Sequence, residues 1–196
     1  MEFARDEIDY RTLSAAVVPR PIAWVSSVSA DGEENLAPFS YFNAVSVTPP
    51  VVMVSVTRFD DSKPDRFKDT LANVQETGEF VVNVVTRPLF EQMVETSARV
   101  AGDVDEWELA DVEQAPSRFV DPPRVAATDI ALECRCCEQV MVGDNTVVFG
   151  DVVHAHVADE VTTGGKVDVS KLDAVGRLSG GLYTFVEEAV SPEGQP

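Results

Sequence analysis

Small polar side chains gather in one short stretch of the sequence, and this stretch is the best suited to bind a ligand. Hydroxyl, amide, alanine and proline residues occur here with aromatic residues around them: Ser26, Ser27, Asn35, Ala37, Pro38, Ser40 and Asn43, flanked by Trp24, Phe39, Tyr41 and Phe42. A flat, amphipathic ligand such as a flavin needs such a wall, because hydroxyl and backbone donors meet its carbonyls while apolar groups cover its ring faces. Serine and asparagine also form turns around hairpins, so a purely structural role stays open.

A second group of residues combines hydroxyls with some of the scarce cations of the chain. It comprises Ser55, Thr57, Arg58, Lys63, Lys68 and Thr70. A helix is expected to start near Asp69, capped by Asp69 or Thr70, and its free N–H groups would favour an anion. This group therefore predicts the phosphate end of a ligand site.

Cysteine and histidine residues occur in two clusters that raise the question of a metal site. Cys134, Cys136 and Cys137 form one stretch, and the only histidines are His154 and His156. A C-x-C pair with an H-x-H pair is not a recognised zinc spacing, and an odd number of cysteines gives no disulfide framework. We expect small strand residues here and no metal site.

The common catalytic motifs are missing. The sequence contains no G-x-G-x-x-G after a strand, no phosphate-binding G-x-x-x-x-G-K-[ST], no G-x-S-x-G and no H-E-x-x-H. A Ser–His–Asp triad is defined by geometry, so spacing does not exclude it, but nothing in the sequence points to one.

The chain is strongly acidic, with 34 Asp and Glu against 15 Lys and Arg and a net charge of −19. Such a field repels nucleic acid and anionic membrane surfaces. The acids are spread along the chain, which favours a halophilic protein over an acidic patch for a basic partner, although that alternative stays open. No apolar run approaches the roughly 18 residues that span a bilayer, and no export signal opens the chain, so we expect a cytoplasmic protein.

Strand patterns dominate, and we expect residues 1–196 to form a single domain. Strands are predicted at Ile22–Val28, from Leu36, and at Val51–Thr57, Phe80–Val85, Ala131–Met141, Thr146–Val157 and Leu182–Val186. Short helices are expected over Lys68–Thr77, after Pro88 and near Trp107. Many strands with few short helices favour a closed barrel over a doubly wound sheet.

Six segments in order resemble the flavin reductase-like, FMN-binding split-barrel family, most closely its flavoredoxin-type branch. They are Pro19–Ser27, Asp31–Asn43 with Ser46–Val56, Lys68–Asn73, Phe80–Asn83, Gly150–Val157 and Gly176–Tyr183. The resemblance implies a mainly β, Greek-key split β-barrel with short helices. It also implies a homodimer that binds FMN near the subunit interface.

The resemblance further assigns residues to the cofactor. Those expected along the ring and ribityl chain are Trp24, Ser26, Ser27, Asn35, Ala37, Pro38 and Ser40. Those expected at the phosphate end are Ser55, Thr57, Lys63, Lys68 and Thr70, with Asp69 capping the helix. Arg177 and Tyr183 would reach the flavin from the C-terminal segment, and His156 would lie close to it or merely occupy a strand position.

Three functions follow as hypotheses. In the first, NADH or NADPH transfers a hydride to flavin N5, as in a flavin reductase, and no catalytic acid or base is required. In the second, the protein is a flavoredoxin-like FMN carrier that moves electrons between protein partners. The third, a barrel that has lost its flavin, is disfavoured by the intact Asn35–Ser40 and Lys68–Thr70 segments.

Overall fold

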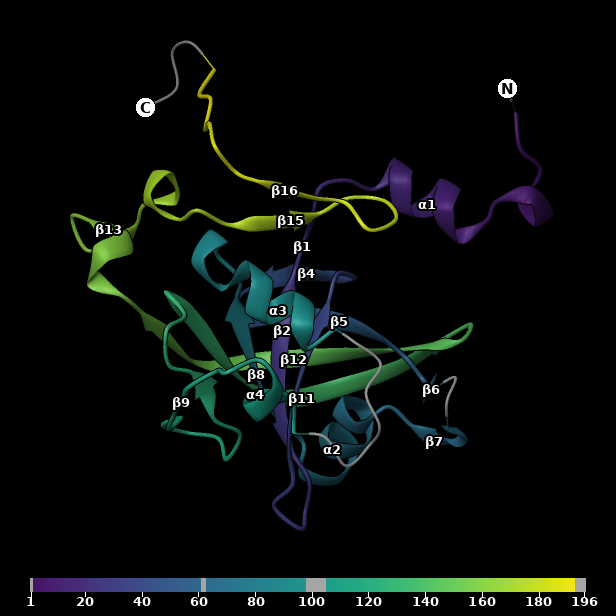
Figure 1. Cartoon of the computed structure of the whole chain (residues 1–196), viewed down its shortest axis with the longest axis horizontal. Helices are drawn as coiled ribbons and strands as arrows, with labels where there is room; N and C mark the ends of the chain where they lie inside the picture. The colour runs from purple at the N-terminus through teal and green to yellow at the C-terminus, as the bar shows by residue number, and fades with distance from the viewer. Residues whose placement is uncertain (1, 61–62, 98–104, 193–196) are drawn as a thin grey trace.

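A seven-stranded antiparallel sheet forms the body of the molecule, with the strand order β3-β2-β8-β11-β12-β5-β4 (Figure 1). The computed structural model describes residues 2–60, 63–97 and 105–192, and only the backbone of residues 59, 60 and 63–67. The seven strands are β2 (Ala23–Val28), β3 (Glu34–Phe39), β4 (Phe42–Val47), β5 (Pro50–Thr57), β8 (Glu79–Val84), β11 (Ile130–Val142) and β12 (Asn145–Val157). The prediction of a mainly β fold is confirmed, and every strand pair of the main sheet is antiparallel.

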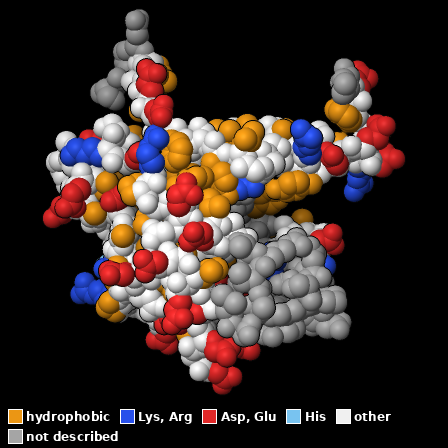
Figure 2. All heavy atoms as spheres, viewed as in Figure 1, with side chains coloured by type: hydrophobic (Ala, Val, Ile, Leu, Met, Phe, Trp, Pro, Cys, Tyr) orange, Lys and Arg blue, Asp and Glu red, His pale blue; other side chains and the backbone are white. Residues whose placement is uncertain are grey.

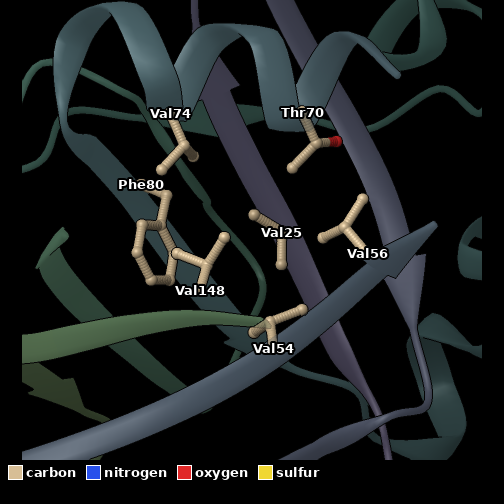
Figure 3. A pocket seen from close by; sticks show the side chains of 7 residues that line it. All are labelled: Val25, Val54, Val56, Thr70, Val74, Phe80 and Val148. Carbon is tan, nitrogen blue, oxygen red and sulfur yellow. The ribbon is translucent and has the colours of Figure 1, made fainter. Parts of the chain in front are cut away.

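The sheet curls into a barrel around an apolar core. Val25 of β2 and Val56 of β5 are separated by three strands in the sheet order, yet both line one small internal cavity (Figure 3). Helix α2 (Asp69–Thr77) covers this core with Leu71 and Val74. Gly78 ends the helix in the left-handed conformation at φ 73°, as the sequence predicts.

The outer face of β2 is buried as well, against a second core. Trp24 points away from the barrel interior and packs with Leu36, Met93 and Trp107. Met93 belongs to α3 (Phe90–Glu95) and Trp107 to α4 (Glu106–Leu109). Because both faces of β2 are covered, its residues from Ala23 to Ser27 are all buried, and the strand is largely apolar in sequence.

A small separate sheet stands above the barrel in Figure 1. It consists of β1 (Arg20–Pro21), β15 (Val175–Arg177) and β16 (Tyr183–Phe185), and α1 (Tyr10–Ala16) extends beside it. The buried guanidinium of Arg20 donates to the carbonyl oxygens of Val17 at 2.7 Å and Leu178 at 2.8 Å. This arginine therefore ties the N-terminal segment to the C-terminal strands.

Short elements complete the described chain. They are β6 (Phe59–Asp60), β7 (Lys63–Phe67), β9 (Gln114–Ala115), β10 (Arg124–Val125), β13 (Thr162–Thr163) and β14 (Lys166–Val167), with 3₁₀ turns at Arg5–Glu7, Arg87–Leu89, Asp159–Val161 and Val169–Lys171. None of the described helices is long and apolar enough to cross a membrane.

Two local predictions need correction. Lys68, rather than Asp69 or Thr70, is the N-cap residue of α2. The sequence analysis also missed β4 and α1. Neither element buries one face, so neither shows the periodic pattern of apolar and polar residues by which a half-buried strand or helix is recognised.

Candidate functional site

Four buried polar side chains hold α2 against the β2–β3 hairpin. The amide nitrogen Nδ2 of Asn35 donates to Oγ1 of Thr70 at 2.8 Å, and Nδ2 of Asn73 donates to Oγ of Ser27 at 3.1 Å. All four residues are buried, so these hydrogen bonds satisfy groups that would otherwise destabilise the fold. The result is a fixed position for the first turn of α2.

Of the predicted phosphate-end residues, Lys68 and Thr70 lie at this first turn, and Thr57 is the last residue of β5. The backbone N–H of Lys68 donates to the carbonyl oxygen of Arg58 at 3.0 Å, which joins the end of β5 to the start of α2. Thr57 is exposed and Lys68 half-buried, while Ser55 accepts from Nδ2 of Asn145 at 2.9 Å. The side chain of Lys68, the N-cap residue, makes no capping hydrogen bond, and the N-terminus of a helix favours an anion. The side chain of Lys63 lies outside the described residues.

The predicted ring-binding residues divide into a buried and a half-buried set. Ala37, Pro38 and Ser40 are half-buried and lie on or just after β3, an outer strand of the main sheet. Trp24 and Ser26 are completely buried: Nε1 of Trp24 donates to Oγ1 of Thr96 at 2.9 Å, and Oγ of Ser26 donates to the carbonyl of Pro123. Only the first set offers surface to a ligand.

Arg177 and Tyr183 lie in the C-terminal sheet, on the opposite side of the barrel from α2 in Figure 1. The guanidinium of Arg177 stacks on the Tyr183 ring at 4.3 Å, and this ring packs edge-on against Phe90 at 5.0 Å. Within one chain, these residues do not join the group around Lys68 and Thr70.

His156 lies beside a buried carboxylate. Its Nε2 is 2.6 Å from Oε1 of Glu133, which also accepts the backbone N–H of Arg118, while Oε2 accepts that of Phe119. Burial alone would raise the pKa of Glu133, but the two backbone donors and His156 hold it below the ordinary value. No hydrogen bond links His156 to another predicted site residue among those described.

The barrel interior cannot hold a flavin. The cavity seen in Figure 3 measures about 10 Å³, near the lower limit for one water molecule, and its lining is almost wholly apolar. A flavin would therefore have to lie outside this cavity.

Sequence reasoning missed Glu106, which lies beside the β3 edge. Burial raises the pKa of Glu106, as do the charges of Asp69 and Asp105, while a hydrogen bond from the backbone of Leu36 lowers it. The sequence carries no signal for this contact, because Glu106 reads as an ordinary acid of a short, acidic helix.

A search of protein-family models matches residues 14–169 to the flavin reductase like domain. The chain belongs to this flavin reductase-like family. The split-barrel fold predicted from the sequence is thereby confirmed, together with a flavin-dependent redox role for the family.

Relatives and a solved structure match between 74% and 98% of this chain. An uncharacterized protein of Aquifex aeolicus is 40% identical over 93% of this chain and 94% of its own. A flavin reductase (NADH) of Kitasatospora aureofaciens is 34% identical over 74% of this chain and 69% of its own. The crystal structure of nitrilotriacetate monooxygenase component B from Bacillus cereus superposes with a TM-score of 0.89 at 31% identity, covering 98% of both chains.

Proposed function

We propose that this chain binds FMN and works as an NAD(P)H-dependent flavin reductase. The observation that carries the proposal is the position of Lys68 at the N-terminus of α2, where its side chain makes no capping hydrogen bond. Strand β3, which contains the half-buried Ala37 and Pro38, is joined to this helix by the Asn35–Thr70 hydrogen bond. This arrangement fits the group, because a phosphate needs N–H donors and a cation, and a ring needs a partly apolar edge.

The residues divide the work of binding. The N-terminal N–H groups of α2, with Lys68 and Thr57, would hold the phosphate. Ala37, Pro38 and Ser40 would line the ring and ribityl chain. Buried residues would hold β2 and β3 in position for these contacts, through the hydrogen bonds described above. They are Trp24, Ser26, Ser27 and Asn35.

Bound FMN would supply the redox chemistry, accepting a hydride from NADH or NADPH at N5 and passing the electrons to an acceptor. The protein then has to bind, orient and partly shield the ring, and needs no proton donor for that transfer. Substitutions in the site are therefore expected to act through FMN affinity or reduction potential.

We also propose a homodimer in which a second copy completes the site. Arg177 and Tyr183 are remote from α2 in one chain, so a flavin contacting both regions requires residues of two chains. Large apolar side chains are exposed on β4 and α1 and beside the C-terminal strands, including Val47 at 87% and Leu182 at 65%. Figure 2 shows hydrophobic side chains gathered around the C-terminal strands, as expected of a surface covered by a partner.

The second candidate is a flavoredoxin-like carrier that exchanges electrons only with protein partners. One observation favours it: the internal cavity lined by Val25 and Phe80 is about 10 Å³, far too small for a nicotinamide dinucleotide. In the homodimer proposed above, a second copy would add walls to the flavin site, and the nicotinamide could then bind between the two chains.

Anaerobic reduction of the FMN-loaded protein separates the two candidates. We expect NADH or NADPH to bleach the visible flavin absorption within the mixing time of a stopped-flow experiment or shortly after. Flavin that stays bound and oxidised with both nucleotides would favour the carrier. A purified protein that retains no added FMN would contradict both.

A further inference from the structure

Both histidines of the chain lie with Glu133 on the outer face of β11 and β12, where the proposed function uses none of them. The potential ligand atoms of Glu133, His154 and His156 all lie within 4.8 Å of one another. The register explains this grouping: Glu133 pairs with His154 and Ala131 pairs with His156, so the three side chains share one face of the sheet.

A break in the strand register brings His154 to this face. Cys134 pairs with Val152 and Glu133 with His154, which leaves Val153 without a paired residue. Such a bulge places two consecutive side chains on the same side of the strand, and bulges of this kind re-aim side chains at functional sites. Cys134 belongs to the barrel core, so it faces the interior and is separated from the histidines.

The carboxylate of Glu133 is rigidly held. It is completely buried, and the backbone N–H groups of Arg118 and Phe119 donate to its two oxygens, each at 2.7 Å. These two bonds and the contact with His156 supply hydrogen-bond partners for both oxygens of the buried carboxylate. The stability of Glu133 therefore does not explain why a second histidine lies beside it. His154 nevertheless packs edge-on against His156 with ring centroids 4.7 Å apart, and Phe119 flanks it at 5.1 Å.

We propose that Glu133, His154 and His156 bind one divalent transition-metal ion, with Zn²⁺ as the best fit, leaving a coordination position open to water. Two imidazoles and a carboxylate form a donor set that such ions prefer. Tetrahedral bonds of about 2.1 Å place ligand atoms about 3.4 Å apart, which side-chain rotation within the present cluster can reach. On binding, the Nε2 of His156 exchanges its contact with Glu133 for the metal, and the ring proton resides on Nδ1.

The bound ion would link the segment around Arg118 and Phe119 to strand β12. Glu133 anchors the segment at Arg118 and Phe119, and this segment continues to Pro123, whose carbonyl accepts from Ser26. A metal bound to Glu133 and the two histidines would connect this segment to β12. It should therefore stabilise the folded state by an amount that rises with the logarithm of its affinity and concentration.

Metal titration of the chelator-treated, purified protein tests the proposal. With excess Mg²⁺ present to occupy the acidic surface, we expect Zn²⁺ to bind at one equivalent per chain by calorimetry and to raise the thermal unfolding midpoint. Co²⁺ should give visible d–d absorption without the near-ultraviolet band of a thiolate ligand. His154→Ala should weaken Zn²⁺ binding at least about tenfold. Substitutions of residues that only support metal ligands already lower metal affinity by about 10–100-fold, and loss of a ligand should cost no less.

Two variants make the result decisive. Cys137→Ser removes the exposed thiol and should leave Zn²⁺ binding unchanged. His154→Ala should keep the far-ultraviolet circular dichroism of the parent, since this histidine is only half-buried. Absence of saturable binding, binding that survives His154→Ala, or binding lost in Cys137→Ser would each overturn the proposal.

Discussion

Lys68 is the side chain on which the phosphate end of the proposed site most depends. It is half-buried at the start of α2, and it is one of only four lysines in a chain of net charge −19. Lys68→Ala should weaken FMN binding about tenfold or more, because a hydrogen bond to a charged group contributes about 1.5–3 kcal/mol. Fluorescence quenching of FMN measures this, and Lys166→Ala, an exposed lysine on β14, should bind as the parent does. Equal affinity in all three proteins would place the phosphate elsewhere.

Thr70 has a different role, because its hydroxyl is committed to Asn35. Thr70→Val keeps the shape of the side chain but leaves the buried amide of Asn35 without this acceptor. We expect the free energy of unfolding to fall by about 1–3 kcal/mol, measured by urea denaturation. Thr70→Ser retains the hydroxyl and should lose clearly less. A Thr70→Val variant that is as stable as the parent would show that this hydrogen bond does not contribute to the free energy of unfolding.

Glu106 should make the stability depend on pH. Its folded-state pKa is raised, chiefly by burial, so its contribution to stability is present below the unfolded pKa and is lost as pH rises through the folded pKa. Glu106→Gln removes this loss, and the variant should gain stability relative to the parent as pH rises from about 4.5 towards 7. Urea denaturation at several pH values measures the difference. Parallel pH profiles for the two proteins would contradict the assignment.

At the scale of elements, β4 is the strand whose exposure most needs an explanation. It is an outer strand of the main sheet, and Val47 at its end is 87% exposed. If a second copy covers it, Val47→Asp should shift the protein towards monomer in light scattering and reduce FMN retention. Val190→Asp, at an equally exposed position of 83% near the C-terminus, is the matched control. A parent that is already monomeric, or an unaffected dimer in Val47→Asp, would exclude β4 as the interface.

Elements with strong local signals could be predicted from the sequence. The β2–β3 hairpin turns at Gly32 with φ 88°, and α2 ends at Gly78, because glycine alone adopts these conformations without strain. The three-residue strand β15 was missed, since its pairing with β1 and β16 depends on segments distant in sequence. The phosphate-end residues of the proposed site stand out in the sequence by their hydroxyls and cations, and their role stays a prediction. The roles of Glu133 and Glu106 were not, because tertiary contacts alone distinguish them from the other 32 acids.

At the scale of the whole molecule, the net charge of −19 determines how stability should respond to salt. With 34 acidic and 15 basic residues, at least 19 carboxylates have no cation of their own within the chain. Their mutual repulsion extends about 10 Å at 0.1 M salt and about 3 Å at 1 M, so salt should stabilise the compact state. We expect the urea midpoint to rise with KCl from 0.1 M towards about 1 M, and to rise less in equally concentrated sucrose, which does not screen charge. A midpoint that is flat or falls with KCl would contradict a surface adapted to high salt. The acids would then be better explained as a patch for a basic partner, whose binding salt would weaken.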